Sequence, residues 1–330
     1  MTSSLPAARC PLPTPAMTVL QSCAMMTTGN KWLVFLACLT GLIPWQCHSL
    51  SVQAAEARSH PQQQNARGHC HSSTIYTYYE PIPMDLRTTG MTQEDDDQLL
   101  LFWKEQWTSA GWNAVVLGVD TVVTCEEYSV LEELLSNELH LDPWGRVVFH
   151  RWMAMAAVGG GWYADYDVFP LGLSDFVPPV ALPNNGRMTV HDILSPTLAS
   201  GTAEQWRDTL LSLLDNAKAN MSPFVADGQW TFWTDSLGIN NLVKDHGKQP
   251  PAPLTAKRVL VPYGRNDLKD CQARSIRGRW VVHMSPKVFQ MAPHLSPLER
   301  HPRYRKQEAQ RWLQRWNNTC LANNQTQTRR

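Results

Sequence analysis

The sequence lacks an excess of charge of either sign, because 29 basic residues balance 29 acidic ones among 330. Proteins that bind nucleic acid normally carry a basic surplus that neutralises phosphates, so the balance argues against that class. Charged residues make up only 18% of the chain and apolar residues 43%, which argues against a highly charged disordered protein. The chain is long enough to bury a core in one large domain or two small ones.

Several nucleotide and catalytic motifs are absent. No Gly-x-Gly-x-x-Gly follows an expected strand, and the sequence has neither a phosphate-binding Gly-Lys-Ser/Thr loop nor a Gly-x-Ser-x-Gly turn. These absences argue against a dinucleotide-binding dehydrogenase, a P-loop NTPase and a serine hydrolase of the α/β type.

Long hydrophobic runs are scarce, and only residues 32–45 (WLVFLACLTGLIPW) stand out, which excludes a multi-pass membrane protein. A spanning helix needs about 20 apolar residues, so this run is short. Residues 32–50 fit a signal peptide, or alternatively a short type II membrane anchor of the thinner membranes early in the secretory pathway. Both alternatives predict a protein of the secretory pathway, either anchored and facing the Golgi lumen or secreted.

Cysteine is also sparse after this run. Four cysteines lie beyond the expected signal or anchor segment 32–50, none in Cys-x-x-Cys spacing: Cys70, Cys125, Cys271 and Cys320. A zinc site is therefore disfavoured, and the alternatives are three disulfide pairings or reduced buried thiols. Asn-x-Ser/Thr glycosylation acceptors at Asn220, Asn317 and Asn324 all follow the apolar run, in agreement with a secretory route.

Composition divides the chain into segments. Residues 1–31 are rich in Ser, Thr, Pro and Ala and predict a disordered leader, and the polar residues 51–72 predict a flexible stalk. We expect one folded domain over residues 73–316 and a disordered tail over 317–330.

The start of this domain predicts a parallel βαβ unit. Residues 73–82 are β-branched and aromatic, residues 92–112 form an amphipathic helical pattern, and residues 113–123 are a continuous apolar run typical of a buried strand. Thr92 is a plausible N-cap, with Asp95 three residues later. Strand, helix and strand with this spacing imply parallel pairing.

The later segments continue the alternation of helices and strands. Further helices are expected at 126–139, 147–158, 205–219 and 303–316, and short strands at 258–263 and 280–283. The whole pattern predicts the α/β class, with a mostly parallel Rossmann-like sheet flanked by helices.

Residues 151–171 (RWMAMAAVGGGWYADYDVFPL) carry the candidate chemistry. A helix ends in three glycines, where backbone can approach a ligand, and runs into an extended piece bearing Asp165 and Asp167. In an extended backbone both carboxylates point to the same side. Their hard oxygens suit Mn²⁺ or Mg²⁺, which keeps open positions for diphosphate oxygens and stabilises the charge on a departing nucleoside diphosphate.

A second Asp-x-Asp triplet, Asp95 to Asp97, shows that the triplet alone is a weak signal, since there it supplies the acidic charge of a helix start. Around Asp165 and Asp167 the context differs, because residues 163–169 are otherwise apolar or aromatic. Buried carboxylates need partners, and a cation is one of the few available.

Arg151 and the eight residues 160–167 (GGWYADYD) resemble the sugar-binding region of glycosyltransferases related to the yeast outer-chain mannosyltransferase and the α-1,4-galactosyl- and N-acetylglucosaminyltransferases. Their pattern is an arginine on a helix followed by Gly-Gly-x-Tyr-x-Asp-x-Asp. The resemblance implies a type A glycosyltransferase fold, a nucleotide-sugar donor, Mn²⁺ or Mg²⁺, and retention of anomeric configuration. The chain departs from the pattern in that Arg151 lies one residue further from the aspartates.

The same resemblance assigns roles within this segment. Asp167 is the direct metal ligand, and Asp165 contacts the donor ribose or a metal-bound water. Arg151 pairs with Asp165 or reaches the diphosphate, with a surface cation as the alternative. Tyr163 lies near the donor or is a core residue. Gly160 and Gly161 belong to the expected donor-binding segment.

Two later positions extend the candidate site. His283 ends an apolar strand and resembles a His-x-Ser that such enzymes often carry near the C-terminal region, which makes it a third metal ligand or a structural histidine. Asp235 resembles an acidic position on the acceptor side, and its alternative is a helix N-cap. Trp230 and Trp233 either form an acceptor platform or pack in the core.

The sequence therefore predicts a metal-dependent hexosyl- or N-acetylhexosaminyltransferase that uses a nucleotide sugar and a glycan or glycoprotein acceptor. One alternative is a lumenal or secreted protein with the same fold that binds a nucleotide sugar or glycan without turnover. A metal-dependent phosphoesterase is disfavoured, because a two-metal site would need more ligands than the sequence offers.

Overall fold

The computed structural model describes residues 74–321 except positions 84–85, 87–89, 140, 173–175, 179, 193–194, 221–232, 263–275, 277 and 293. All of them belong to one compact unit within residues 66–330. The predicted leader, the apolar segment and the stalk lie outside the described residues.

Strands and helices alternate through the described part of the chain. The strands are β1 (Thr74–Tyr78), β2 (Asn113–Leu117), β3 (Gly160–Ala164), β4 (Val168–Pro170), β5 (Thr189–Val190), β6 (Leu198–Thr202), β7 (Leu254–Thr255), β8 (Val259–Leu260) and β9 (Val281–His283). The α-helices are α2 (Gln93–Ser109), α3 (Val119–Val122), α4 (Tyr128–Glu133), α5 (Pro143–Ala157), α6 (Ala203–Asn220), α7 (Asp235–His246), α8 (Pro286–Met291) and α9 (Arg305–Trp316). Short helices of other types are η2 (Leu134–Glu138), η4 (Asn184–Gly186), η5 (Pro302–Tyr304) and η6 (Asn317–Leu321).

The central sheet has six strands in the order β2-β1-β3-β6-β5-β7. β1 pairs in parallel with β2 and β3, whereas β6 runs antiparallel to both β3 and β5, and β7 pairs in parallel with β5. A smaller sheet has the order β4-β9-β8. The α/β class is thus confirmed, but the sheet is mixed and the expectation of a mostly parallel sheet is wrong.

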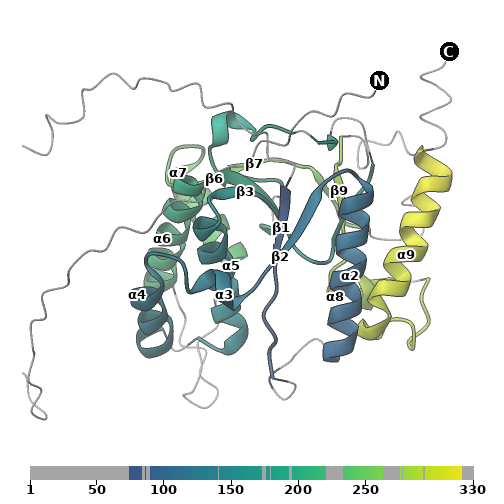
Figure 1. The fold of residues 1–330 in the computed structure, drawn as a ribbon, viewed down its shortest axis with the longest axis horizontal. Coiled ribbons are helices and arrows are strands. Elements are labelled where there is room, and N and C mark those ends of the chain that lie inside the picture. The colour runs from purple at the N-terminus through teal and green to yellow at the C-terminus, as the bar shows by residue number, and fades with distance from the viewer. Residues whose placement is uncertain are drawn as a thin grey trace, which may run out of the picture. The chain divides into compact units, whose positions relative to one another are not determined.

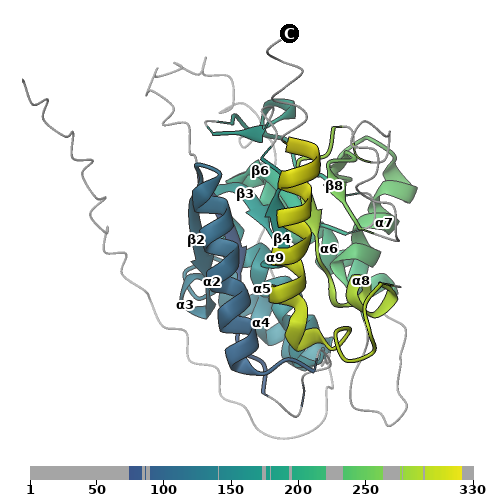
Figure 2. The same cartoon turned by 90° about the vertical axis from the view of Figure 1, so that its right-hand side faces the viewer.

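Helices cover the central sheet on both faces (Figures 1 and 2). On one side α5 and α6 pack together and against β3, with Trp152 and Trp206 in the core between them. On the other side α2 and α9 lie side by side, and Trp107 and Trp316 belong to a second core cluster. A sheet buried on both faces explains the apolar strands seen in the sequence.

The predicted βαβ unit is present. β1 and β2 pair in parallel from Thr74 with Asn113 to Tyr78 with Leu117, and α2 connects them. Thr92 is the N-cap of α2 and forms a capping box with Asp95, so the first Asp-x-Asp triplet serves the helix start as expected.

Several boundaries differ from the sequence prediction. The strand expected over 113–123 ends at Leu117, because the chain turns at Gly118 into helix α3. The helix expected over 147–158 begins four residues earlier, at Pro143, where Asp142 accepts a hydrogen bond from the Gly145 amide. Its end is as expected, since α5 stops before Gly159, whose φ is +90°.

The C-terminal tail was expected to be disordered from residue 317. Residues 317–321 instead form η6 directly after α9, and Cys320 is buried. Cys320 is disulfide-bonded, whereas Cys125 is a free, buried thiol. The partner of Cys320 therefore lies outside the described residues.

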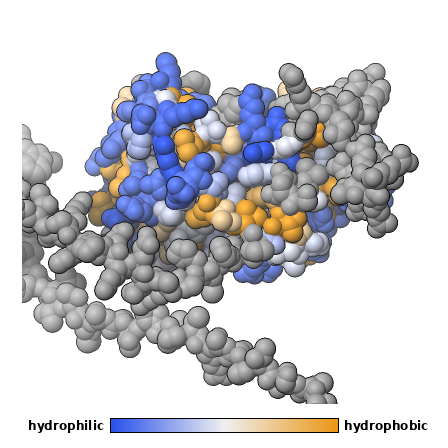
Figure 3. Space-filling model, turned by 90° about the horizontal axis from the view of Figure 1, so that it is seen from above, coloured by the Kyte–Doolittle hydropathy of each residue, from blue (hydrophilic) through white to orange (hydrophobic). Residues whose placement is uncertain are grey.

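No helix among the described residues is long and apolar enough to cross a membrane. Seen from above, the described surface is largely hydrophilic, with apolar side chains showing in smaller areas between the polar ones (Figure 3).

A buried histidine gives the core a pH-dependent element. His191 is 1% exposed, its ring stacks on Trp162 at 5.1 Å between centroids, and its Nε2 lies 3.0 Å from the Ser200 hydroxyl. Burial, with a smaller contribution from the nearby Arg258 cation, lowers the pKa of His191 to about 3. The folded protein therefore holds this imidazole neutral at all physiological pH values.

We expect His191 to make folding weaker in acid. Its folded-state pKa lies below the 6.5 of an unfolded histidine, so the unfolded chain takes up the extra proton between pH 6.5 and 3, and stability falls as the pH drops through this range. From pH 7 to pH 5 this contributes a loss of about 2 kcal/mol. The free energy of unfolding is measured in urea at pH 7 and at pH 5. We expect it to fall less between these pH values in His191→Gln than in wild type, and an equal fall in both proteins would contradict the prediction.

Candidate functional site

A pocket of about 450 Å³ opens where the ends of β1, β3 and β9 meet α5 and α7. Its volume lies within the range of small-molecule sites. The apolar and aromatic residues that line it include Tyr78, Trp144, Val147 and Val148. Hydroxyl and amide side chains also line it: Ser195, Thr197, Thr234, Ser236, Ser285 and Gln290. The charged residues and the one histidine of the lining are Arg151, Asp165, Asp167, Asp235, His283 and Arg305.

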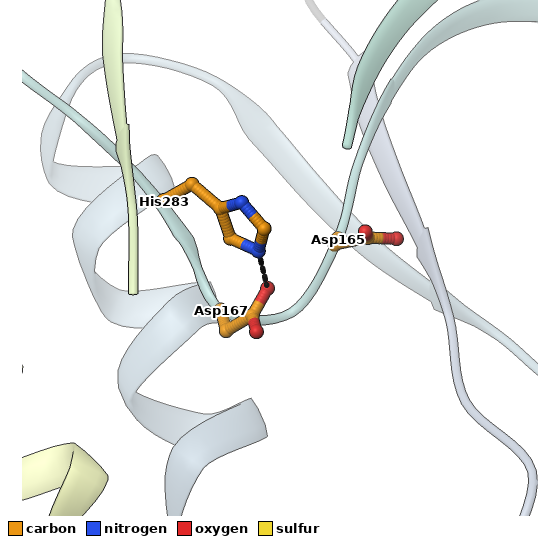
Figure 4. Close-up of side chains that lie close together, drawn as sticks. All are labelled: Asp165, Asp167 and His283. Atoms are coloured by element: carbon orange, nitrogen blue, oxygen red, sulfur yellow. Dashed lines mark ion pairs between the residues drawn. The ribbon is translucent and has the colours of Figure 1, made fainter. Parts of the chain in front are cut away.

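Asp165, Asp167 and His283 each offer a ligand atom, and these atoms lie within 4.8 Å of one another. In Figure 4 the imidazole of His283 points at the Asp167 carboxylate, and the Asp165 carboxylate lies beside this pair, turned to the side. The structure therefore brings together the three residues that were expected to hold a metal.

The two aspartates do not lie on an extended strand, so the expected alternation is wrong. β3 ends at Ala164, and the Val168 amide donates to the Asp165 carbonyl at 2.9 Å, which closes a four-residue turn between β3 and β4. The turn, rather than a pleat, places both carboxylates at the pocket.

Pairing between two short strands places His283 beside Asp167. β4 and β9 are antiparallel, and His283 stands opposite Val168, the residue after Asp167. His283 Nε2 consequently lies 3.4 Å from Asp167 Oδ1. This contact joins positions more than a hundred residues apart in the sequence.

The two oxygens of Asp167 have different environments. Oδ2 forms an ion pair with the guanidinium of Arg305. Oδ1 is buried, makes no hydrogen bond of normal geometry to a described residue, and lies 3.4 Å from His283 Nε2, with which it forms an ion pair when the imidazole is protonated. A buried carboxylate oxygen without a hydrogen bond is costly unless a cation or water satisfies it, so this atom fits a metal ligand.

Charges in the site shift the pKa values of its members. Burial raises the pKa of Asp167, but His283 and Arg305 outweigh it and hold the pKa at about 2. Burial raises the pKa of Asp165, and neighbouring Arg151 offsets this only in part. Burial lowers the pKa of His283, but Asp167 raises it by more, to above the usual 6.5. Asp167 is thus the permanently ionised member of the cluster.

Arg151 links two of the predicted acids. Its Nη1 donates to Asp165 Oδ1 at 2.8 Å and its Nη2 pairs with Asp235 Oδ2. Tyr163 also donates to Asp165 Oδ1, at 2.6 Å, although its ring is nearly buried. Arg151 pairs with Asp165 as one of the two predicted alternatives has it, and the surface-cation alternative is wrong because the side chain is only 14% exposed.

Asp235 lines the pocket but is not the N-cap of α7. Thr234 takes that position and accepts a hydrogen bond from the Leu237 amide at 3.2 Å. Asp235 is 2% exposed, and its Oδ2 accepts a 2.9 Å hydrogen bond from the Trp152 ring nitrogen as well as the pair with Arg151. Its carboxylate therefore holds Arg151 in place.

The glycines of the segment have a packing role. Gly160 pairs with Thr202 on β6, and a Cβ at Gly160 would come within 2.5 Å of the Ala203 backbone nitrogen. Neither Gly160 nor Gly161 is among the residues that line the pocket. Their predicted contact with a donor finds no support in this geometry.

The two tryptophans considered for an acceptor platform have different outcomes. Trp233 is 1% exposed and stacks on Phe149, with 4.9 Å between ring centroids, so it packs in the core. Trp230 lies outside the described residues.

Arg305 lines the pocket and pairs with Asp167, and sequence reasoning missed it. It is 2% exposed, although its segment reads as an ordinary basic helix. Charge alternates with apolar residues along α9, and nothing in that pattern distinguishes Arg305 from the exposed Arg311 and Arg315. Only tertiary packing identifies it.

Comparison with known proteins gives a family match and structural likenesses. Residues 48–227 match the model of a family described as "Domain of unknown function (DUF8765)". No curated protein matches the chain. A crystal structure of a glycosyltransferase involved in the glycosylation of the major capsid of PBCV-1 is similar with 10% identity and a TM-score of 0.32, covering 69% of this chain and 96% of that one. Because the family match extends over more than half of the sequence, the chain belongs to the DUF8765 family.

Proposed function

We propose that this protein is a glycosyltransferase that uses a divalent cation and a nucleoside diphosphate sugar. The observation that carries the proposal is the pocket at Asp165, Asp167 and His283, in which the Asp167 Oδ1 atom is buried without a hydrogen bond. Two carboxylates and an imidazole fit Mn²⁺, and the carboxylates fit Mg²⁺. The resemblance of residues 160–167 to sugar-binding segments supports the same reaction class.

Asp167 and His283 would hold the cation, and Asp165 would contact it through water or bind the donor ribose, since one of its oxygens already accepts from Arg151 and Tyr163. A bound cation supplies Lewis-acid stabilisation of the leaving diphosphate.

Arg151 and Asp235 would keep Asp165 in a fixed orientation, because the Arg151 guanidinium pairs with Asp165 through Nη1 and with Asp235 through Nη2. Such fixed charges stabilise a transition state without having to reorganise.

The mixed lining of the pocket supports a substrate with a ring system and hydroxyl groups. Trp144, at the start of α5, lines the pocket and is 40% exposed, so its aromatic face would stack on a nucleobase or sugar ring. The serine and threonine hydroxyls of the lining offer donors and acceptors for sugar hydroxyls. We propose a hexose or N-acetylhexosamine as the transferred group, a glycan or glycoprotein as acceptor, and retention of anomeric configuration.

The disulfide at Cys320 supports a location in an oxidising compartment, where disulfides form and persist. Asn220 and Asn317 are exposed, as glycosylation acceptors must be. We therefore propose a location in the secretory pathway, either facing the Golgi lumen or secreted.

A donor screen tests the proposal. Purified protein is incubated with UDP-sugars, GDP-sugars and other nucleoside diphosphate sugars, with and without Mn²⁺, and free nucleotide is measured. We expect release from one donor, loss of release with EDTA, and recovery when Mn²⁺ is added back. Binding of a nucleotide sugar without release of nucleotide from any donor, with any acceptor, would favour a binding protein. No binding of any nucleotide would overturn the transferase and leave only a glycan-binding protein.

A further inference from the structure

Arg305 places a permanent positive charge inside the candidate metal site. It is the first residue of α9 and is 2% exposed, so its charge is not screened by solvent. Its Nη2 pairs with Asp167 Oδ2, and its Nε lies 3.4 Å from the Met284 carbonyl oxygen. Its Nη1 contacts the sulfur of Met91 at 3.2 Å, and the guanidinium lies 5.8 Å from the centre of the Tyr166 ring. The guanidinium is thus held from several sides.

These contacts leave only one oxygen of the Asp167 carboxylate for a metal cation. Arg305 occupies Oδ2 and leaves only Oδ1 toward Asp165 and His283. Asp167 can therefore bind a cation through one oxygen but not through both. An arginine is always protonated, so Arg305 compensates the negative charge of the Asp167 carboxylate at every pH.

The charge balance of the pocket is nearly even. Three carboxylates (Asp165, Asp167 and Asp235) face two guanidinium groups (Arg151 and Arg305), which leaves a single net negative charge when His283 is neutral. A divalent cation binds weakly where ligand charge is low, and Mg²⁺-type sites commonly complete their ligand set with substrate phosphates. A nucleoside diphosphate would bring the missing negative charge.

We propose that Arg305 neutralises Asp167 before metal is bound and thereby makes binding of the divalent cation depend on a nucleoside diphosphate. Arg305 is a positioning residue in this scheme, since it acts through Asp167. The inference rests on the proposed function, because it takes the aspartates and His283 as the cation site. Binding of cation and nucleotide are then coupled, and thermodynamic linkage requires each to strengthen the other by the same factor.

The test is Mn²⁺ binding measured by electron paramagnetic resonance, which needs no turnover. In the wild-type protein, UDP or GDP should tighten Mn²⁺ binding at least tenfold. Arg305→Met removes the charge while keeping a long apolar side chain, and it should bind Mn²⁺ alone at least tenfold more tightly than wild type, with a smaller effect of nucleotide. A loosened structure would weaken metal binding, so a gain in affinity separates the charge effect from damage to the fold.

Matched variants control for charge and stability. Arg303→Met removes an exposed charge two residues away and should bind Mn²⁺ like wild type. Arg305→Lys keeps the charge and should keep the dependence on nucleotide. If Arg305→Met does not fold by circular dichroism, Arg305→Gln replaces it as the charge-removing variant, and its affinity for Mn²⁺ alone is compared with those of wild type and Arg305→Lys.

The outcomes separate this inference from the proposed function. Equal Mn²⁺ affinity with and without UDP and GDP, or a folded neutral variant that binds Mn²⁺ alone no more tightly, would overturn the role of Arg305 alone. Coupled binding without sugar release would leave that role standing and overturn glycosyl transfer. A protein that binds no Mn²⁺ under any condition would overturn both.

Discussion

Asp167→Asn is expected to lower Mn²⁺-dependent release of nucleotide from the donor sugar by about a thousandfold. Asp167 supplies the one carboxylate oxygen of the cluster that is buried without a hydrogen bond, and its pKa of about 2 keeps it charged at any working pH. An amide loses that charge and with it the strongest attraction for a cation. The measurement is the initial rate of nucleotide release at saturating Mn²⁺, with folding checked by circular dichroism.

The same variant should also lose about 3 kcal/mol of stability, because Arg305 would remain buried without its partner. Asp97→Asn is the matched control, since Asp97 ends the other Asp-x-Asp triplet and is exposed, with its carboxylate accepting a 2.8 Å hydrogen bond from Gln93. We expect wild-type rates from it. A large loss in Asp97→Asn with near-normal rates in Asp167→Asn would show that the wrong pair of acids has been assigned.

Gly160→Ala is expected to destabilise the fold by about 3 kcal/mol or to prevent folding. Gly160 has φ +76°, where an L-residue is strained, and its new Cβ would come within 2.5 to 2.7 Å of three backbone atoms in residues 201–203. Backbone atoms of a paired strand cannot move aside as a flexible side chain can. Urea unfolding at neutral pH, or the yield of soluble protein, measures the effect.

Gly159→Ala separates backbone strain from this clash. Gly159 has φ +90°, but a Cβ there would meet nothing within 4 Å. We expect a loss of about 1 kcal/mol, which comes from the positive φ alone. If the free energy of unfolding fell equally in both variants, the close approach of Gly160 to β6 would not explain why a glycine is needed at position 160.

Local signals in the sequence predicted several elements correctly. Thr92 and Asp95 identified the start of α2, Gly159 identified the end of α5, and the apolar runs around them identified β1 and β2 as a parallel pair. The two helix ends depend on residues within a few positions of one another, and capping geometry and side-chain periodicity act over that range. The parallel pairing of β1 with β2 follows from the helix that connects the two strands.

The errors arose where tertiary contacts outweigh local pattern. Residues 119–122 continue an apolar run yet form α3, because the chain leaves the sheet at Gly118. β6 pairs antiparallel with β3, which the alternation of helices and strands does not indicate. Residues 317–319 are polar, yet residues 317–321 are helical, since they follow α9 and Cys320 is buried there.

In the candidate site, too, some features follow from the sequence and others only from the tertiary structure. The sequence alone determined that Asp165 and Asp167 stand together in an apolar segment after a glycine break, because neighbours in the chain stay neighbours in any fold. Their joint presentation by a turn, the approach of His283 through β9, and the burial of Arg305 against Asp167 were decided by tertiary structure. The contacts of His283 and Arg305 with Asp167 span more than a hundred residues, and the pairing and packing that create them depend on the whole core.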